Sequence, residues 1–294
     1  GFLKHGDHVI ISCYEHNAVL RPLHHLQESG IIDYSVIKRE DLDLSPDEIY
    51  SKYAKKNTRL LAMTLASNLT GRIVYREDLF HLLKKKGIAT FVDASQGAGK
   101  IPLNMKDESI DFLAFTGHKD LLAIPGVGGL CCESDSHFEP MIQGGTGVHG
   151  EQYTNPDIFP DGYEAGTLNM PAIWSLYAGI GYVSSHRESI QKKECDLLKY
   201  LMERLSSIDD VMIYDEDVHR VSTCCINLNS ISSDRLVALL DSNGICVRGG
   251  IHCAILAHEA IGTVSTGAVR ISLGFMNTMK EIDELVEVLR KVGG

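Results

Sequence analysis

The sequence predicts an α/β fold in which a mostly parallel sheet is flanked by helices and followed by a smaller α+β unit. Apolar runs alternate with amphipathic stretches along the first part of the chain, which is typical of βαβ units. At 294 residues the chain exceeds the usual size of one domain, so we expect two. We place their boundary near residue 185, which gives a large unit at 1–185 and a small unit at 186–294.

The large unit is predicted to begin with a strand at 7–12 and a helix at 17–29. Residues 45–48, Ser-Pro-Asp-Glu, form a capping box with proline at the first helical position, so a second helix begins there. A third helix at 77–86 ends at Gly87, as a C-terminal cap glycine should. The remaining apolar runs predict strands at 31–37, 59–64, 89–92, 112–115 and 128–132.

Regular patterns disappear from about Asp135 to Gly166. Glycine, proline and aromatic residues there predict an ordered loop that carries function or contacts. A long helix is predicted from Pro171 to Leu205, with a break near Ser184-Ser185. The small unit then follows. Its predicted strands are 211–214, 222–227 and 268–273, and its predicted helices are 233–242 and 279–292.

Charge and composition exclude several classes of partner. Lysine and arginine number 28 against 39 acidic residues, and this balance of -11 argues against nucleic acid and anionic membranes. No apolar run is long enough to cross a bilayer, and no signal-peptide pattern opens the chain. The eight cysteines form no C-x-x-C pair, and His24-His25 lack zinc-like spacing, so we expect neither a disulfide framework nor a metal site. We expect a reduced, cytoplasmic protein.

Two predicted strands end on charged residues that an apolar run does not favour. Residues 89–92 lead into Asp93, and residues 112–115 lead into Thr116-Gly117-His118-Lys119. The carboxyl ends of parallel strands open onto a ligand crevice, so Asp93 and Lys119 could grip opposite ends of one organic ring. Lysine forms Schiff bases with carbonyl cofactors, and a pyridine nitrogen favours an acidic partner. Taken alone, an Asp at the end of a strand is more often a helix cap or loop anchor, and a lysine such as Lys119 is more often on the surface.

Further polar residues follow other predicted strands. Thr116 and His118 offer a hydroxyl and an imidazole, which suit a phosphate beside the Lys119 amine. His16 comes just after the first strand and could either start a helix or stack on an aromatic cofactor. Asn68 lies in a segment with the composition of a turn, where its side chain could act as a donor.

Two features of the predicted small unit could take part in chemistry. Cys253 follows a stretch with two glycines, which implies an exposed turn. Arg248 and His252 could favour its thiolate form, so Cys253 is the thiol that we expect to be reactive. Arg270 stands inside an apolar strand and needs an anion, which is either a structural carboxylate or a substrate carboxylate.

Six ordered segments together resemble the class V aminotransferase group of pyridoxal-phosphate enzymes, and specifically its cysteine desulfurase and selenocysteine lyase branch. The segments are Tyr14-Glu15-His16-Asn17, Ala66-Ser67-Asn68-Leu69-Thr70-Gly71, Val92-Asp93-Ala94-Ser95-Gln96, Thr116-Gly117-His118-Lys119, Glu164-Ala165-Gly166-Thr167-Leu168-Asn169 and the stretch around Cys253. The resemblance implies a fold-type I pyridoxal-phosphate-dependent transferase. Its sheet is of the mostly parallel, seven-stranded type with the first strand missing here, and the enzyme is a homodimer.

The resemblance also implies roles for single residues. Lys119 would bond to the aldehyde of pyridoxal 5'-phosphate and carry the Cα proton, while Asp93 would keep the pyridine nitrogen protonated. The other cofactor contacts would come from His16 on the ring, Gln96 and Asn68 near the phenolic oxygen, and Thr116, His118 and Thr167 of the partner subunit at the phosphate. Substrate contacts would come from Arg270, Arg248 and Asn68.

The implied reaction uses Cys253 as the sulfur acceptor. Its attack on the sulfur of L-cysteine gives L-alanine and an enzyme persulfide, which an acceptor protein could discharge. L-Selenocysteine as substrate, and a transaminase or β-lyase activity, stay open. The resemblance further implies a segment ahead of Gly1 that holds a phosphate-binding helix start. A non-catalytic fragment that keeps this fold is therefore the contrasting hypothesis.

Overall fold

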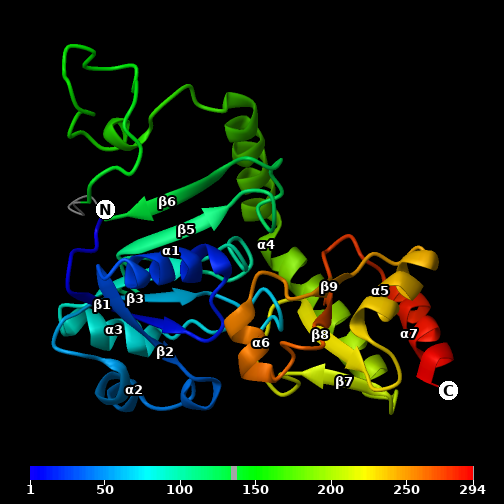
Figure 1. The fold of residues 1–294 in the computed structure, drawn as a ribbon. Coiled ribbons are helices and arrows are strands. Elements are labelled where there is room, and N and C mark those ends of the chain that lie inside the picture. Colours follow the sequence, from blue (N-terminus) through cyan, green and yellow to red (C-terminus); the bar gives the residue numbers. More distant parts are fainter. Residues whose placement is uncertain (134–137, 294) are drawn as a thin grey trace.

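The protein folds around two separate sheets, as Figure 1 shows for the computed structural model, which describes residues 1–133 and 138–293. The first sheet has six strands in the order β2-β1-β3-β4-β5-β6, of which all neighbours pair in parallel except β5 and β6. Its strands are β1 (Asp7–Ser12), β2 (Ile32–Ile37), β3 (Thr58–Thr64), β4 (Ala89–Asp93), β5 (Phe112–Thr116) and β6 (Gly128–Cys132). The predicted α/β architecture is confirmed.

Three helices cover this sheet on both faces (Figure 1). They are α1 (Asn17–Glu28), α2 (Pro46–Tyr53) and α3 (Glu77–Lys85). Alternation along β1 explains the two layers, since Ile10 packs in the apolar cluster with α2 and α3 while Val9 and Ile11 pack in the cluster with α1. The predicted capping box at Ser45 is present, with Glu48 bonded back to the Ser45 main chain.

The second sheet is antiparallel, in the order β7-β8-β10-β9. Its strands are β7 (Val211–Tyr214), β8 (Thr223–Leu228), β9 (Arg248–Gly250) and β10 (Ala268–Ser272), and its helices are α5 (Ser233–Ser242), α6 (Ile255–Ile261) and α7 (Met279–Gly293). Buried side chains of α5, α7 and the end of α4 pack on it as a core of their own. The short elements β9 and α6 were not predicted.

One long helix, α4 (Met170–Leu205), runs from beside the first sheet into the second unit (Figure 1). The predicted break near Ser184-Ser185 is wrong, because the helix is continuous there. The Ser185 hydroxyl donates to the carbonyls of Gly181 and Tyr182 at 2.8 and 3.0 Å, so its polar group is satisfied inside the helix. The division at residue 185 falls within α4 and stays a prediction.

The predicted loop between the sheets is present over its described part. Residues 138–166 hold one short 3₁₀ turn at Asp161–Tyr163, whereas residues 135–137 of the prediction lie outside the described residues. The segment projects from the body of the molecule in Figure 1. Within the described residues, no helix is apolar over a length that could cross a bilayer. Those residues also contain no cluster of three or more potential metal ligands.

A buried carboxyl joins the carboxyl ends of β1 and β3. Glu15 is fully buried, and its Oε1 accepts hydrogen bonds from the Ser12 hydroxyl at 2.5 Å and the Thr64 amide at 2.9 Å. Its Oε2 has no partner among the described residues. Burial raises the pKa of Glu15 to about 8, so the folded protein favours the neutral acid.

This raised pKa predicts a pH-dependent difference between the protein and Glu15→Gln. Because the folded state holds the proton more tightly, the stability that it contributes is full below the unfolded pKa and is lost as pH rises toward 8. The amide does not titrate, so between about pH 5 and pH 8 the unfolding free energy of Glu15→Gln should rise relative to that of the wild type by roughly 3.5 kcal/mol. Urea titrations measure this gain. Glu203→Gln, on the exposed surface of α4, should show none.

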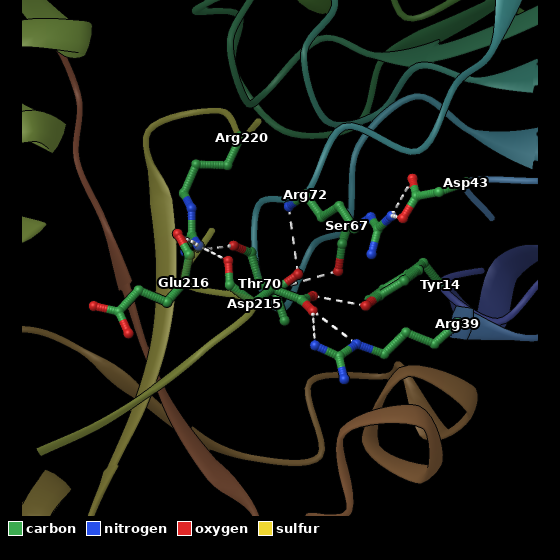
Figure 2. A network of polar contacts seen from close by, with 9 residues as sticks. All are labelled: Tyr14, Arg39, Asp43, Ser67, Thr70, Arg72, Asp215, Glu216 and Arg220. Atoms are coloured by element: carbon green, nitrogen blue, oxygen red, sulfur yellow. Dashed lines mark hydrogen bonds and ion pairs between the residues drawn. The ribbon is translucent and has the colours of Figure 1, made fainter. Parts of the chain in front are cut away.

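A network of charges connects the two units (Figure 2). Asp215, which follows β7, is buried and accepts from the Tyr14 hydroxyl at 2.7 Å and from Arg39 Nε at 2.9 Å. Arg220 of the same segment donates to the carbonyls of Asp215 and Thr70. The network therefore fixes the turn at 67–72 of the first unit against the second unit.

The backbone of Gly71 lies close to the second unit. Its φ is +77°, and a Cβ built there would lie 2.2 Å from the Thr223 carbonyl oxygen. Gly71→Ala should therefore lower the unfolding free energy by about 3 kcal/mol, through left-handed strain and this clash together. Gly87→Ala shares a φ of +75° but meets nothing within 4 Å, so it measures the strain alone. Equal losses in the two variants would show that the units do not pack here as described.

Candidate active site

Asp93, Lys119 and His16 are close enough for their charges to act on one another. Asp93 ends β4, and Lys119 lies in the turn that follows β5. Burial lowers the pKa of Lys119 most, Asp93 opposes that effect, and Arg270 adds to it. Burial likewise lowers the pKa of His16, followed by the charge of Lys119, while Asp93 raises it. The predicted pair thus meets at the carboxyl edge of the sheet.

Asp93 is a buried carboxylate that forms no ion pair within the described residues. It is 6% exposed, and its Oδ1 accepts from the Ser95 amide at 2.9 Å. No ion pair to Asp93 is present in the described parts of the chain. A buried carboxylate of this kind is suited to a cation supplied by a ligand, such as a protonated ring nitrogen. Gln96 lies half-buried three residues further on.

His16 caps helix α1. Its Nδ1 accepts from the Ala18 amide at 3.0 Å, so the proton of the neutral ring is on Nε2. The helix-start interpretation of His16 is therefore confirmed. The half-buried ring uses one nitrogen for the cap, which leaves its face free for the stacking role that the resemblance implies.

The turn after β5 brings Thr116 and His118 together. The Thr116 hydroxyl lies 2.8 Å from His118 Nδ1, and His118 is exposed. Gly117 between them is tightly packed, since a Cβ there would lie 2.9 Å from Val127 Cγ1 and 3.0 Å from Ala123 Cβ. The two polar side chains thus lie together on a turn that has no space for a side chain at its central glycine.

Asn68 links the first unit to two candidate residues of the second. Its side-chain Nδ2 donates to the carbonyl of His252 at 2.7 Å, and its main-chain oxygen accepts from Arg270 at 2.9 Å. Two buried polar atoms are left without partners among the described residues, namely Asn68 Oδ1 and Arg270 Nε. An unpaired acceptor and an unpaired guanidinium donor at one place match the ammonium and carboxylate of an amino acid.

Cys253 is held at the same interface. It is exposed, has a φ of +56°, and its carbonyl accepts from the Asn17 amide at 2.8 Å. Arg248 lies on β9 directly opposite Arg270 of β10. That Arg248 and His252 favour a Cys253 thiolate stays a prediction, and burial lowers the pKa of His252 to about 4, which favours the neutral ring. Its Nε2 is bonded to the Arg248 carbonyl at 3.0 Å.

A cavity between the units is lined by one of these candidate residues, Lys119. It has a volume of about 320 Å³ and is lined by Lys119 and Asp120 from the first unit and by Ser272 from the second. A larger cavity of about 470 Å³ contains none of the candidate residues in its lining. Thr167 is exposed ahead of α4, and within the described residues it forms no hydrogen bond to the other candidates.

Sequence reasoning missed three residues that organise this site. Asn17 holds the Cys253 carbonyl, and its adjacency to His16 in a matched segment was the available signal. Asp120 accepts from the Gly97 amide at 2.9 Å and pairs with Lys100 at 2.9 Å, which anchors the Lys119 turn. Lys100 also pairs with Glu194 of α4 at 2.8 Å, a contact that no local pattern indicates.

Known proteins share both the sequence pattern and the fold. A probable cysteine desulfurase of Methanothermobacter thermautotrophicus is 31% identical, with 99% of this chain and 74% of the relative aligned. A cysteine desulfurase of Pectobacterium carotovorum is 30% identical over 99% of this chain and 72% of its own length. The apo cysteine desulfurase of Thermococcus onnurineus superposes with a TM-score of 0.85 at 28% identity, over 99% of this chain and 74% of that one.

A further structure supports the fold alone. The cysteine desulfurase CsdA of Escherichia coli has a TM-score of 0.89 at 24% identity and covers 99% of this chain and 73% of its own. The family described as Aminotransferase class-V matches residues 1–285. Enzymes of that family depend on pyridoxal 5'-phosphate, and the fold-type I architecture implied by the resemblance is confirmed. The chain therefore belongs to the class V aminotransferase family.

Proposed function

We propose that this chain is a pyridoxal-phosphate-dependent cysteine desulfurase that converts L-cysteine to L-alanine and keeps the sulfur on Cys253 as a persulfide. One observation carries the proposal. The exposed Cys253 thiol belongs to a loop whose carbonyls are bound by Asn17 and Asn68 of the first unit, beside the edge that bears Lys119. The curated relatives named cysteine desulfurase support the same activity.

The residues at this edge fit pyridoxal 5'-phosphate. Asp93 is buried without a cationic partner in the described residues, and burial lowers the pKa of Lys119, which makes a free amine more available. When bound, the cofactor supplies an electron sink next to the substrate Cα. We propose that Asp93 holds the ring nitrogen, that Lys119 bonds to the aldehyde carbon, and that His16 stacks on the ring.

The remaining contacts follow from where the polar groups lie. We propose that Thr116 and His118 bind the phosphate and that Gln96 and Asn68 lie near the phenolic oxygen. Thr167 of the partner subunit would complete the phosphate site, since Thr167 makes no hydrogen bond to the other candidates in the described part of its own chain. None of these assignments requires a metal ligand.

On the substrate side, Arg270 binds the carboxylate. Its unpaired, buried Nε provides the donor, and its NH1 is fixed by the Asn68 carbonyl. Arg248 lies opposite on β9 and adds a second positive charge. This pair orients L-cysteine with its side chain toward the second unit, where the Cys253 thiol is exposed.

The sulfur step balances with no further reactant. Lys119 takes the proton from Cα and is placed to return one to carbon. The Cβ–S bond breaks while an S–S bond forms between the substrate sulfur and Cys253. The proton that the Cys253 thiol gives up is balanced by the hydrogen that Cβ gains, and the proton taken from Cα returns to Cα, which completes L-alanine. The two products are therefore L-alanine and a persulfide at Cys253.

We further propose a homodimer. Large apolar side chains are exposed in the projecting loop and on the first turns of α4, which is unusual for a monomer. They include Met141, Ile142, Tyr153, Phe159, Trp174 and Tyr177. An interface on this face would bring Thr167 of each chain toward the other. We also propose that the same site accepts L-selenocysteine and passes the persulfide sulfur to an acceptor protein. The division into units 1–185 and 186–294 is likewise a proposal.

Cys253→Ala should lower the rate of L-alanine formation from L-cysteine at least about 100-fold, because the departing sulfur loses its nucleophile. Alanine release by the cofactor-supplemented protein is the measurement. Cys246→Ala provides the matched control, since Cys246 is also an exposed free thiol and should leave the rate unchanged. An unchanged rate in Cys253→Ala would favour a transaminase or β-lyase instead.

Lys119→Ala should remove the visible absorbance that pyridoxal phosphate gives when it bonds to a protein amine. Spectra are recorded after the protein has been incubated with the cofactor and dialysed. Lys199→Ala should retain the band, because that lysine is 79% exposed on α4. A band that survives in Lys119→Ala would place the cofactor on another amine, and a colourless wild type would support a non-catalytic fragment.

A further inference from the structure

The Cys253 loop has a backbone that must be held in place. His252 and Cys253 have φ values of +54° and +56°, in the left-handed region that residues other than glycine rarely adopt. Two such residues in succession cost free energy, so contacts around the loop must maintain them. Asn68 and Asn17 bind the two carbonyls from the first unit. The second unit contributes a different kind of contact.

A chain of three buried side chains runs away from this loop. His252 Nε2 lies 3.0 Å from the Arg248 carbonyl, and His252 Nδ1 lies 3.4 Å from His258 Nε2. His258 Nδ1 in turn lies 2.7 Å from the Thr263 hydroxyl. His252 is 4% exposed, His258 is 0% exposed and Thr263 is 2% exposed, so water cannot replace these bonds.

For two neutral rings, one arrangement of protons satisfies these three contacts. The Arg248 carbonyl can only accept, so His252 carries its proton on Nε2 and its Nδ1 accepts. His258 must then donate from Nε2, which leaves its Nδ1 to accept from Thr263. The chain therefore has a fixed direction, and each ring is neutral with the proton on Nε2.

The surroundings of the pair oppose protonation. Burial lowers the pKa of His252 most, the hydrogen bond to the Arg248 carbonyl raises it, and the charges of Arg270 and Arg248 lower it further. Burial also lowers the pKa of His258, against the carbonyls of Thr263 and Ile251. A second proton on His252 would place one N–H group directly against another, which would break the link.

We propose that His258 and Thr263, acting through a neutral His252, are positioning residues that hold the loop in the conformation that presents the Cys253 thiol. The inference rests on the proposed role of Cys253 as sulfur acceptor. Neither histidine touches substrate or cofactor in this account. Their effect is on the fraction of molecules whose thiol is in place, so it should alter kcat and leave KM nearly unchanged.

Two substitutions of His258 separate the bond from the packing. His258→Gln keeps an N–H donor close to the position of Nε2, whereas His258→Leu fills the space and leaves His252 Nδ1 unpaired. We expect kcat for L-alanine formation to fall about tenfold in His258→Leu and to recover largely in His258→Gln. His8→Leu is the matched control, because His8 is also fully buried and bound by two hydroxyls, those of Thr58 and Ser35, at the far end of β1.

A second readout needs neither cofactor nor turnover. The alkylation rate of Cys253 by iodoacetamide, followed by peptide mass spectrometry, should change about tenfold in His258→Leu, revert in His258→Gln and stay constant in His8→Leu. Nitrogen NMR of labelled histidine should show protons on Nε2 of both His252 and His258 at neutral pH.

The outcomes are distinguishable. Constant alkylation in His258→Leu, or His252 titrating near the ordinary pKa of histidine, would overturn the positioning role. An equal fall of kcat in His258→Leu and His8→Leu would also overturn the positioning role, since general destabilisation would then explain the effect. If Cys253→Ala keeps full activity, the sulfur-acceptor role fails, and the alkylation series still decides whether the histidines position the thiol.

Discussion

The position of the second unit over the first depends on Asn68. Its side chain donates to the His252 carbonyl and its own carbonyl accepts from Arg270, so one residue aligns both the thiol loop and the substrate-binding arginine. Asn68 can do this only because its turn is fixed from behind. Gly71 allows the backbone to lie close to Thr223, and the Asp215 network in Figure 2 ties the second unit to Tyr14.

Charged residues that hold the fold together differ from those at the candidate site in whether they form ion pairs. Charges that connect elements are matched within the chain, as in the Lys100 pairs with Asp120 and Glu194. The charges at the candidate site are different, because Asp93, Lys119 and Arg270 form no ion pair among the described residues. The fully buried Glu15 differs from both groups, because its raised pKa favours the neutral acid. Such unmatched charges suit a ligand that carries both an acid and a base.

Local patterns were sufficient to predict much of this arrangement. The strands that end at Asp93 and Thr116 were predicted within a residue, since each is an apolar run bounded by turn residues. The three-residue strand β9 was missed, because only its pairing with β10 defines it. The continuity of α4 through Ser185 was missed for a similar reason, as a serine pair looks like a break until its bonds are known. Contacts across long separations, such as Arg39 with Asp215 at 176 positions, leave no local signal.

The central claim is that residues of both units act on a single substrate molecule. A single turnover with sulfur-labelled L-cysteine tests it most directly, because the fate of carbon and sulfur can be followed together. The account predicts one L-alanine for each labelled persulfide, with the label on the peptide that contains Cys253 and on none of the other seven cysteines. L-Alanine formed with the label free in solution, or fixed on another cysteine, would contradict it.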